Sequence, residues 1–189
     1  MNFNLTDEQN IIVETVRTFL EKEIYPHEKS VDETGVVPKE LGIEIAKKCK
    51  EIGFFASNMP ETVGGGGLNH LNFTLLEREL GRGSNALTVF FGRPSGILMA
   101  CNEEQKEKYL YPAIKGDKFD ALAMTEPGAG SDVRGMECSA IEKGGDWVVN
   151  GTKHFISHAN IADFVIVFIA TGEEQTNKGS KRKISCFLV

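Results

Sequence analysis

A ten-residue stretch, AMTEPGAGSD at residues 123–132, combines residue types that hold polar or anionic ligands. Thr125 and Ser131 supply hydroxyl donors, while Gly128 and Gly130 let the backbone turn sharply and approach a ligand closely. Hydrogen-bond donors on a backbone that can approach a ligand closely suggest that the ligand is a phosphate. The stretch has no lysine and lacks the G-x-G-x-x-G spacing, so it matches neither a P-loop nor a dinucleotide fingerprint. From these residues alone, a phosphate cradle and a plain tight turn both remain open.

A second candidate segment is KHFIS, residues 153–157, which begins two residues after the glycine of an Asn-Gly pair. On an extended strand Lys153, Phe155 and Ser157 would share one face. A flat aromatic ring with a hydroxyl two residues away would suit a planar ring system that carries nitrogen acceptors, such as a flavin. The alternative is an exposed hairpin with one core phenylalanine, and the spacing alone favours that alternative.

For the other residues that could do chemistry, we expect structural roles rather than catalysis or metal binding. On a strand His154 and His158 would lie about 13 Å apart, so we expect no shared metal. Ser/His/Asp catalysis stays open, but Ser131 has no identifiable base and no G-x-S-x-G elbow. Glu126, which precedes a proline, is expected to order the turn rather than to transfer protons. Arg93 is expected to cap a kinked helix rather than to bind an anionic substrate group.

The first half of the chain is predicted to be helical, because its apolar residues recur with helical spacing. Thr6 and Gln9 form a possible capping box at the first helix, and the glycines of residues 64–67 are expected to form a loop between helices. We predict helices from Thr6 to Pro26, from Pro38 to Gly53, over residues 69–80, over residues 84–100 with an interruption near Pro94, and from Asn102 to a stop at Pro112.

Beyond Asp120 the apolar spacing changes to that of strands. The Asn150-Gly151 pair predicts a hairpin between residues 147–150 and 152–157. Three more strands of a meander are predicted over residues 136–141 before the turn KGGD, 164–170 and 184–189, and residues 121–124 form a short apolar, strand-like run. We therefore predict an N-terminal all-α helical bundle, residues 1–119, followed by an antiparallel β-barrel or sandwich domain, residues 120–189. The stretch 123–132 would lie at their junction, where ligand crevices are common.

Composition indicates an ordinary soluble globular chain of 189 residues with a formal net charge of -6. The one basic cluster, residues 178–183, is expected to be a solvated loop, so a duplex nucleic-acid partner is not expected. Four scattered cysteines without a C-x-x-C pair indicate reduced thiols. No apolar run is long enough to span a bilayer, and the N-terminus is unlike a transit peptide, so we expect a cytoplasmic location without membrane attachment.

Several segments carry a family resemblance. AMTEPGAGSDV resembles the first signature of the acyl-CoA dehydrogenases: a small residue, an apolar one, Ser or Thr, Glu, two free positions, a small residue, Gly, Ser or Thr, then Asp. NGTKHFIS resembles that family's N-G-x-K-x-[FWY]-I-[TS] segment. PETVGGGGL, LLERELGRG and EEQKEKYLYPAIKGD resemble further segments, so the resemblance covers nearly the whole chain.

The resemblance implies the family's N-terminal domain and part of its middle domain, with FAD as cofactor. Thr125 is implied to hydrogen-bond the flavin ring, Phe155 to stack near it, and Ser157 to lie beside flavin N5. Gly130 and Ser131 are implied to meet the diphosphate region, and Ser131 also the thioester substrate. Serine at 157 and phenylalanine at 155 depart mildly from the commoner threonine and tryptophan. The implied cofactor-binding residues are Leu122, Met124, Thr125, Gly130, Ser131, Phe155, Ile156 and Ser157.

The resemblance also implies the reaction, which is FAD-dependent α,β-dehydrogenation of an acyl-CoA, with electrons passed to an electron-transfer flavoprotein. The full-length protein is implied to be a homo-oligomer, a dimer or tetramer, with a role in fatty acid or amino acid catabolism. The family's catalytic glutamate belongs to a C-terminal helical domain, so we expect no catalytic base here, a truncated β domain and an inactive isolated chain of poor stability. Alternatives are a flavin oxidase or monooxygenase on the same fold, or a non-catalytic fragment.

Overall fold

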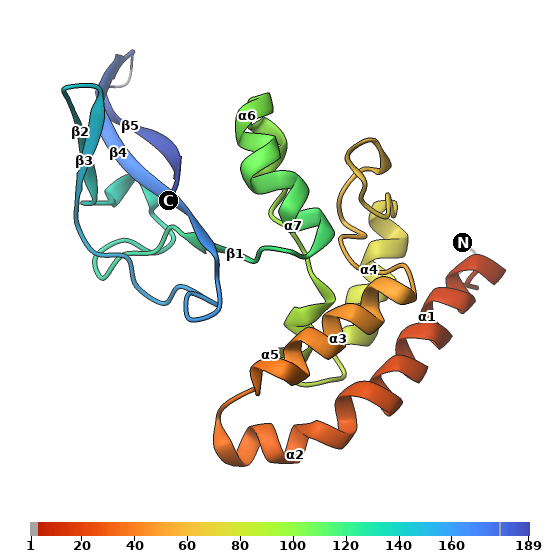
Figure 1. The fold of residues 1–189 in the computed structure, drawn as a ribbon. Helices are drawn as coiled ribbons and strands as arrows, with labels where there is room; N and C mark the ends of the chain where they lie inside the picture. Colours follow the sequence, from red (N-terminus) through yellow and green to blue (C-terminus); the bar gives the residue numbers. More distant parts are fainter. Residues whose placement is uncertain (1–3, 178) are drawn as a thin grey trace. The chain divides into compact units, whose positions relative to one another are not determined.

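The computed structural model describes residues 4–177 and 179–189. The chain divides into two compact units, Met1–Asp117 and Lys118–Val189, and each has apolar clusters of its own. The first unit is helical and the second contains the sheet (Figure 1). The predicted fold class, a helical bundle followed by an incomplete β domain, is confirmed. In the described part of the chain, every helix is too short or too polar to traverse a lipid bilayer.

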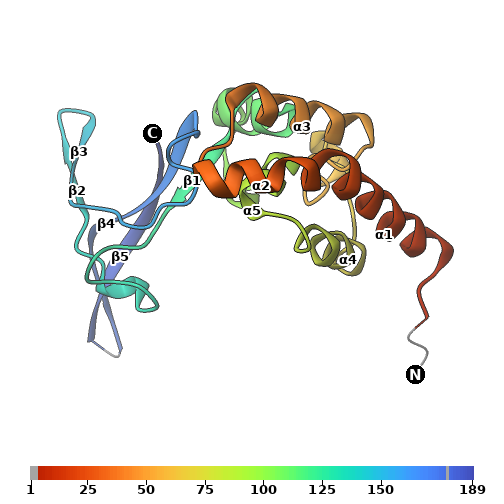
Figure 2. The same cartoon turned by 90° about the horizontal axis from the view of Figure 1, so that it is seen from below.

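The helical unit is built around α1 (Asp7–Phe19), which packs against α4 (His70–Leu80). The apolar face of α1, including Ile12 and Val16, is buried with Ile45 of α3 and Leu76 of α4. Figure 2 shows the same helices from below. The remaining elements are η1 (Leu20–Ile24), α2 (Tyr25–Thr34), α3 (Lys39–Glu51), η2 (Glu61–Val63), α5 (Asn85–Thr88), η3 (Val89–Phe91), η4 (Gly96–Ala100), α6 (Glu103–Gln105), η5 (Lys106–Leu110) and α7 (Tyr111–Lys115).

Helix starts follow the predicted capping residues. Thr6 and Gln9 bond reciprocally as a capping box at α1, and Asn102 and Gln105 do the same at α6. Asn69 caps α4 by accepting a hydrogen bond from the backbone N–H of Asn72 at 2.9 Å. These side chains satisfy backbone donors that the first helical turn leaves without a partner.

The predicted helix ends at Pro26 and Pro112 are wrong. Each proline lies in the first turn of a further α-helix, α2 and α7, directly after a π-helical turn, η1 and η5. The Tyr25 N–H reaches back five residues to the carbonyl of Leu20. A proline ring normally clashes with the carbonyl four residues earlier, and the widened turn before it removes that conflict. The helix therefore continues past the proline.

The helix predicted over residues 84–100 is also wrong in extent. Only α5 is α-helical there, followed by the 3₁₀ segments η3 and η4 on either side of Pro94. Gly92 adopts a positive φ of 67°, which ends η3, and a proline two residues later does not allow the helix to resume. The loop at residues 64–67 lies inside the helical unit as predicted.

A buried carboxylate joins α1 to α4. Glu79, with a side chain 1% exposed, accepts ion pairs from Arg17 at 2.7 Å, Arg78 at 2.7 Å and Arg82 at 3.0 Å. The hydrogen bond from Arg17 lowers the pKa of the Glu79 carboxyl, against the opposing effect of burial. The ion pair between Arg17 and Glu79 thus links α1 to α4 beside their apolar contact.

The second unit contains one five-stranded sheet. Its strands are β1 (Asp120–Ala123), β2 (Ser139–Lys143), β3 (Asp146–Asn150), β4 (Phe164–Thr176) and β5 (Gly179–Leu188), with a short 3₁₀ segment η6 (Val133–Gly135) before β2. The order is β1-β4-β2-β3, and β5 also pairs with β4.

The predicted meander is wrong, because β2 pairs in parallel with β4. The strand-like run at residues 121–124 lies in β1, which also pairs in parallel with β4. Asp120 lies opposite Phe164 and Ala123 opposite Val167. Parallel neighbours need a crossover connection, and residues 124–163 supply it. The hairpin of β2 and β3 around the KGGD turn and the antiparallel pairing of β4 with β5 agree with the prediction. The sheet is therefore mixed.

The Asn150-Gly151 hairpin is also wrong. Residues 151–157 form no strand, and Gly151 instead crosses over Cys138, where an added Cβ would come within 2.2 Å of the sulfur. Its φ of 139° favours glycine. The basic run predicted to be a solvated loop lies largely in β5, where Arg182 is opposite Glu173 and Lys181 opposite Glu174. Lys178 of that run lies outside the described residues.

Candidate functional site

The turn that follows β1 is closed by its own backbone. The N–H of Glu126 donates to the carbonyl of Ala129 at 3.0 Å, and the N–H of Ala129 donates back at 3.2 Å. At its far end the Asp132 side chain accepts from the Arg134 N–H at 3.2 Å and starts η6. Residues 124–132 thus leave the sheet and return as one compact turn. We name residues 124–131 the donor turn.

Glu126 anchors the donor turn from inside. Its carboxylate, 3% exposed, accepts hydrogen bonds from the Glu137 N–H at 2.5 Å, from the Cys138 N–H at 3.1 Å and from Lys153 Nζ at 2.7 Å. Burial alone would raise the pKa of Glu126, but the bonds from Lys153, Glu137 and Cys138 lower it to about 2. A carboxylate so committed orders the turn and is not a proton acceptor at neutral pH, as its position before a proline predicts.

Lys153 connects the donor turn to the segment that follows Gly151. Its ammonium also donates to the carbonyl of Met124 at 3.0 Å, and the N–H of His154 donates to the carbonyl of Thr125 at 2.8 Å. Sequence reasoning missed this role for Lys153, because its partner lies 27 residues away along the chain. The signal that could have found it is the lysine that NGTKHFIS shares with the N-G-x-K-x-[FWY]-I-[TS] segment.

The segment KHFIS is a loop, so the predicted alternation of its side chains is wrong. Lys153 is turned inward to Glu126, whereas the Phe155 side chain is exposed, with 81% of the residue accessible. Phe155 adopts a positive φ of 56°, which costs a bulky residue about 1 to 3 kcal/mol. Its ring stacks on His154 with centroids 3.6 Å apart. Ile156 is half-buried and Ser157 is exposed.

The residues predicted to touch a ligand remain accessible at the donor turn. Thr125 and Met124 are half-buried, Gly130 and Ser131 are exposed, and an added Cβ at Gly128 or Gly130 would meet nothing within 4 Å. Within the described residues the hydroxyls of Thr125 and Ser131 have no hydrogen-bond partner in the protein. Leu122 on β1 is 43% exposed. The turn therefore offers free donors next to apolar surface.

The other residues that could do chemistry lie outside the donor turn. In the described part of the chain, no three histidine, cysteine or acidic side chains are grouped to hold a metal ion. The Arg93 guanidinium pairs with Glu77 and donates to the Thr88 carbonyl at 3.3 Å. Arg93 thus stabilises the irregular stretch after α5, in agreement with its predicted structural role.

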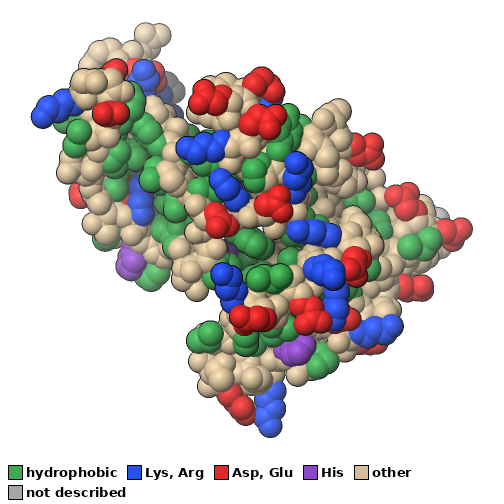
Figure 3. Space-filling model, viewed as in Figure 1, with side chains coloured by type: hydrophobic (Ala, Val, Ile, Leu, Met, Phe, Trp, Pro, Cys, Tyr) green, Lys and Arg blue, Asp and Glu red, His purple; other side chains and the backbone are tan. Residues whose placement is uncertain are grey.

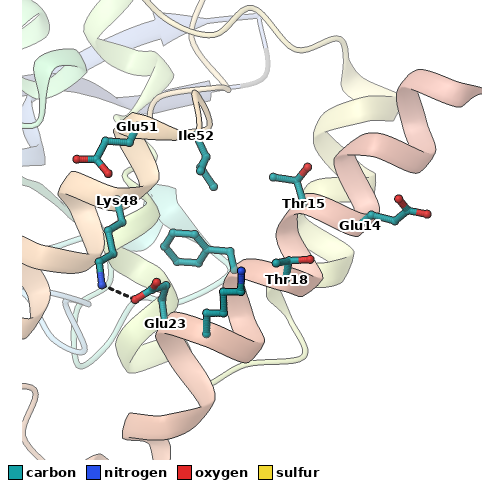
Figure 4. A pocket seen from close by; sticks show the side chains of 9 residues that line it. Glu14, Thr15, Thr18, Glu23, Lys48, Glu51 and Ile52 are labelled. Carbon is teal, nitrogen blue, oxygen red and sulfur yellow. Dashed lines mark hydrogen bonds and ion pairs between the residues drawn. The ribbon is translucent and has the colours of Figure 1, made fainter.

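A separate groove of about 470 Å³ lies in the helical unit between α1 with η1 and α3 (Figure 4). Lys48 of α3 pairs across it with Glu23 at 2.6 Å, and Phe19 contributes apolar surface. None of the predicted ligand-binding residues lines this groove. On the face of the molecule in Figure 3, acidic and basic side chains are interspersed.

Comparison with known proteins gives consistent matches. The family described as "Acyl-CoA dehydrogenase, N-terminal domain" matches residues 6–117, and "Acyl-CoA dehydrogenase, middle domain" matches residues 121–189. A 3-(aryl)acrylate reductase of Clostridium sporogenes is 38% identical over 189 residues, which cover 97% of this chain and 48% of that protein. A subunit of the caffeyl-CoA reductase-Etf complex of Acetobacterium woodii is 34% identical over 190 residues, which cover 97% of this chain and 48% of that protein.

Solved structures share the fold. A glutaryl-CoA dehydrogenase of Mycobacterium smegmatis, solved in complex with FADH2, has a TM-score of 0.81 and 29% identity, covering 98% of this chain and 46% of that chain. This chain spans about half the length of the curated relatives it matches.

Proposed function

Because this chain belongs to the acyl-CoA dehydrogenase family, we propose that it forms one wall of an FAD site in a flavoenzyme that acts on the α,β bond of an acyl-CoA thioester. The observation that carries the proposal is the donor turn, where free hydroxyls at Thr125 and Ser131 lie beside exposed apolar residues. Residues 1–119 are proposed as the helical domain and residues 120–189 as the middle domain.

The residues present fit an FAD. Its ring system is flat and apolar with acceptor atoms at its edge, and its diphosphate needs hydrogen-bond donors and room. Leu122, Met124 and Phe155 are proposed to supply apolar contact, and Thr125 a hydrogen bond to the ring. Gly130 leaves open space that a Cβ would reduce. Ile156 is proposed to add apolar contact and Ser157 to offer its exposed hydroxyl to the ring, and Ser131 is proposed to meet both the diphosphate region and the thioester.

When bound, FAD supplies the two-electron redox chemistry of the reaction. This chain's residues bind and orient the ring. A general base must also remove the substrate's α-proton. Glu126 is unsuited to that role, because its carboxylate is buried and held by Lys153 and two backbone N–H groups. We propose that the base is a glutamate outside these residues, in the part of the protein that corresponds to the family's C-terminal domain.

The proposed partners are an acyl-CoA and an electron-transfer flavoprotein, within a homo-oligomer. The names of the Acetobacterium woodii and Mycobacterium smegmatis relatives support the substrate class, and the first also supports an Etf partner. An acyl-CoA made from a dicarboxylic acid carries a free carboxylate that an arginine could bind. Arg82 and Arg93 already form ion pairs with Glu79 and Glu77, so neither is proposed to bind such a carboxylate.

The test uses the complete protein purified with its flavin. Anaerobic addition of a saturated acyl-CoA is expected to bleach the flavin absorption, and a 2,3-unsaturated acyl-CoA is expected to reoxidise the reduced protein. Free fatty acid serves as the control. A protein that shows no bound flavin, or a flavin that no acyl-CoA bleaches, would contradict the proposal. Bleaching followed by rapid peroxide formation in air would favour an oxidase on the same fold.

A further inference from the structure

We propose that Glu126 and Lys153 act as a buried clamp whose role is to position the flavin, and that Lys153 is a positioning residue for it. The proposal rests on the proposed function, since it concerns the same FAD site. The clamp touches no substrate or flavin atom itself. It acts through the donor turn on one side and through Phe155 to Ser157 on the other.

The first argument is the path of the connections. Within the described residues, every hydrogen bond that joins residues 151–157 to the donor turn passes through Lys153 or His154. Lys153 donates to Glu126 at 2.7 Å and to the Met124 carbonyl at 3.0 Å, and the His154 N–H donates to the Thr125 carbonyl at 2.8 Å. Since residues 151–157 belong to no strand, the separation of Thr125 from Phe155 is fixed by these bonds.

The second argument is the backbone of Phe155. A bulky residue with a φ of 56° is strained, and such strain persists only where neighbouring contacts impose it. Burial does not offset it, because Phe155 is 81% exposed. The residues that impose the conformation are therefore the anchored pair directly before it, Lys153 and His154. An exposed aromatic ring held in a strained conformation is expected where it faces a ligand.

The third argument is the completeness of the network. The Glu126 carboxylate accepts from Lys153 and from the N–H groups of Glu137 and Cys138, so it draws together three separate segments of the chain. Lys153 is 11% and Glu126 3% exposed at the side chain, so the pair is shielded from solvent and from salt. A buried, fully bonded pair holds a fixed geometry better than an exposed one.

The experiment compares FAD binding and flavin spectra among variants of the complete protein. Lys153→Met removes the charge at nearly the same length, and the double variant Glu126→Gln with Lys153→Met leaves no unpaired buried charge. Lys153→Arg keeps the charge with a different shape. Lys106→Met is the matched control, because Lys106 forms an ion pair of 2.7 Å with Glu103 within the helical unit, whereas the clamp belongs to the sheet unit.

We expect the double variant to fold, to bind FAD about tenfold more weakly than wild type, and to show a shifted flavin absorption band, because the apolar and polar contacts to the ring are displaced. Lys153→Arg is expected to recover part of the affinity and of the band position. Lys106→Met is expected to match wild type in both. Circular dichroism on each variant identifies any that is unfolded.

A folded double variant with wild-type FAD affinity and an unshifted band would overturn the proposal and leave the pair a purely structural role. If the double variant does not fold, the single variant Lys153→Met decides: an unshifted band and unchanged affinity in that folded variant would overturn the proposal equally. A wild-type protein that binds no FAD would instead contradict the proposed function, which is a distinguishable result.

Discussion

At the scale of single residues, the chemistry of the donor turn depends on one carboxylate. Glu126 could be assigned a turn-ordering role from its place before a proline, and its buried bonds to Glu137 and Cys138 confirm it. Lys153 could not be assigned in the same way, because a sequence does not show which distant charges meet. The free hydroxyls of Thr125 and Ser131 were found from residue type alone.

The stability supplied by Glu126 is expected to depend on pH. Its pKa when folded, about 2, lies below the ordinary value of 4.5, so its contribution is complete above the ordinary value and is lost as the pH falls toward 2. Glu126→Gln leaves Lys153 buried without its counter-charge, which costs about 3 kcal/mol at neutral pH. We expect the difference in unfolding free energy between wild type and Glu126→Gln to shrink between about pH 4.5 and 2.

Urea titrations at stepped pH measure this difference. Glu104→Gln is the control, since it removes one carboxylate from an exposed position. A difference between wild type and Glu126→Gln that stays constant down to pH 2 would show that Glu126 is not held ionised in the folded chain.

At the scale of elements, the helix starts and the ends of α3 and α4 could be predicted, whereas the ends placed at Pro26 and Pro112 were wrong. Capping residues such as Thr6 and Asn102 act within one turn, so a local pattern identifies them. The effect of Pro26 and Pro112 depends on whether a π-helical turn precedes them, and no residue type marks that turn. The prediction of a strand at residues 152–157 was wrong. Its residues can alternate between two faces only as part of a strand, and a strand forms only where a neighbouring strand is available to pair with it.

The position of Pro26 predicts how replacement will act. Because η1 already accommodates the proline in the first turn of α2, Pro26→Ala is expected to change the unfolding free energy by less than about 1 kcal/mol. Glu14→Pro, at an exposed position inside α1, is expected to cost about 3 kcal/mol or more. Thermal unfolding followed by circular dichroism compares the two. Equal destabilisation by both would mean that Pro26 is itself required to form the π-helical turn.

At the scale of the whole chain, the division into a helical and a β region followed from the change of apolar spacing near residue 120. The strand order did not follow, because the pairing of β1 with β4 joins residues about forty positions apart and depends on packing that no local pattern encodes. The backbone hydrogen bonds of a helix form within one segment of the chain, whereas β1 and β4 pair only when this long crossover closes. Loop closure of that length delays pairing.

We therefore expect the helical unit to become protected before the sheet during refolding of the chain. Pulse-labelling hydrogen exchange is expected to find the amides of α1 and α4 protected earlier than those of β1 and β4. Because the donor turn lies within the crossover, it should be ordered with the sheet. Simultaneous protection of α1 and β1 would contradict this order.

The tryptophan and the tyrosines of the chain are intrinsic fluorescent probes, and they lie in different units. Its single tryptophan, Trp147 of β3, lies edge-on to the Phe187 ring of β5 with centroids 5.4 Å apart, so the tryptophan belongs to the sheet unit. The three tyrosines, Tyr25, Tyr109 and Tyr111, all belong to the helical unit. Selective excitation of the tryptophan thus reports on the sheet alone, and tyrosine emission reports on the helices, without any introduced dye.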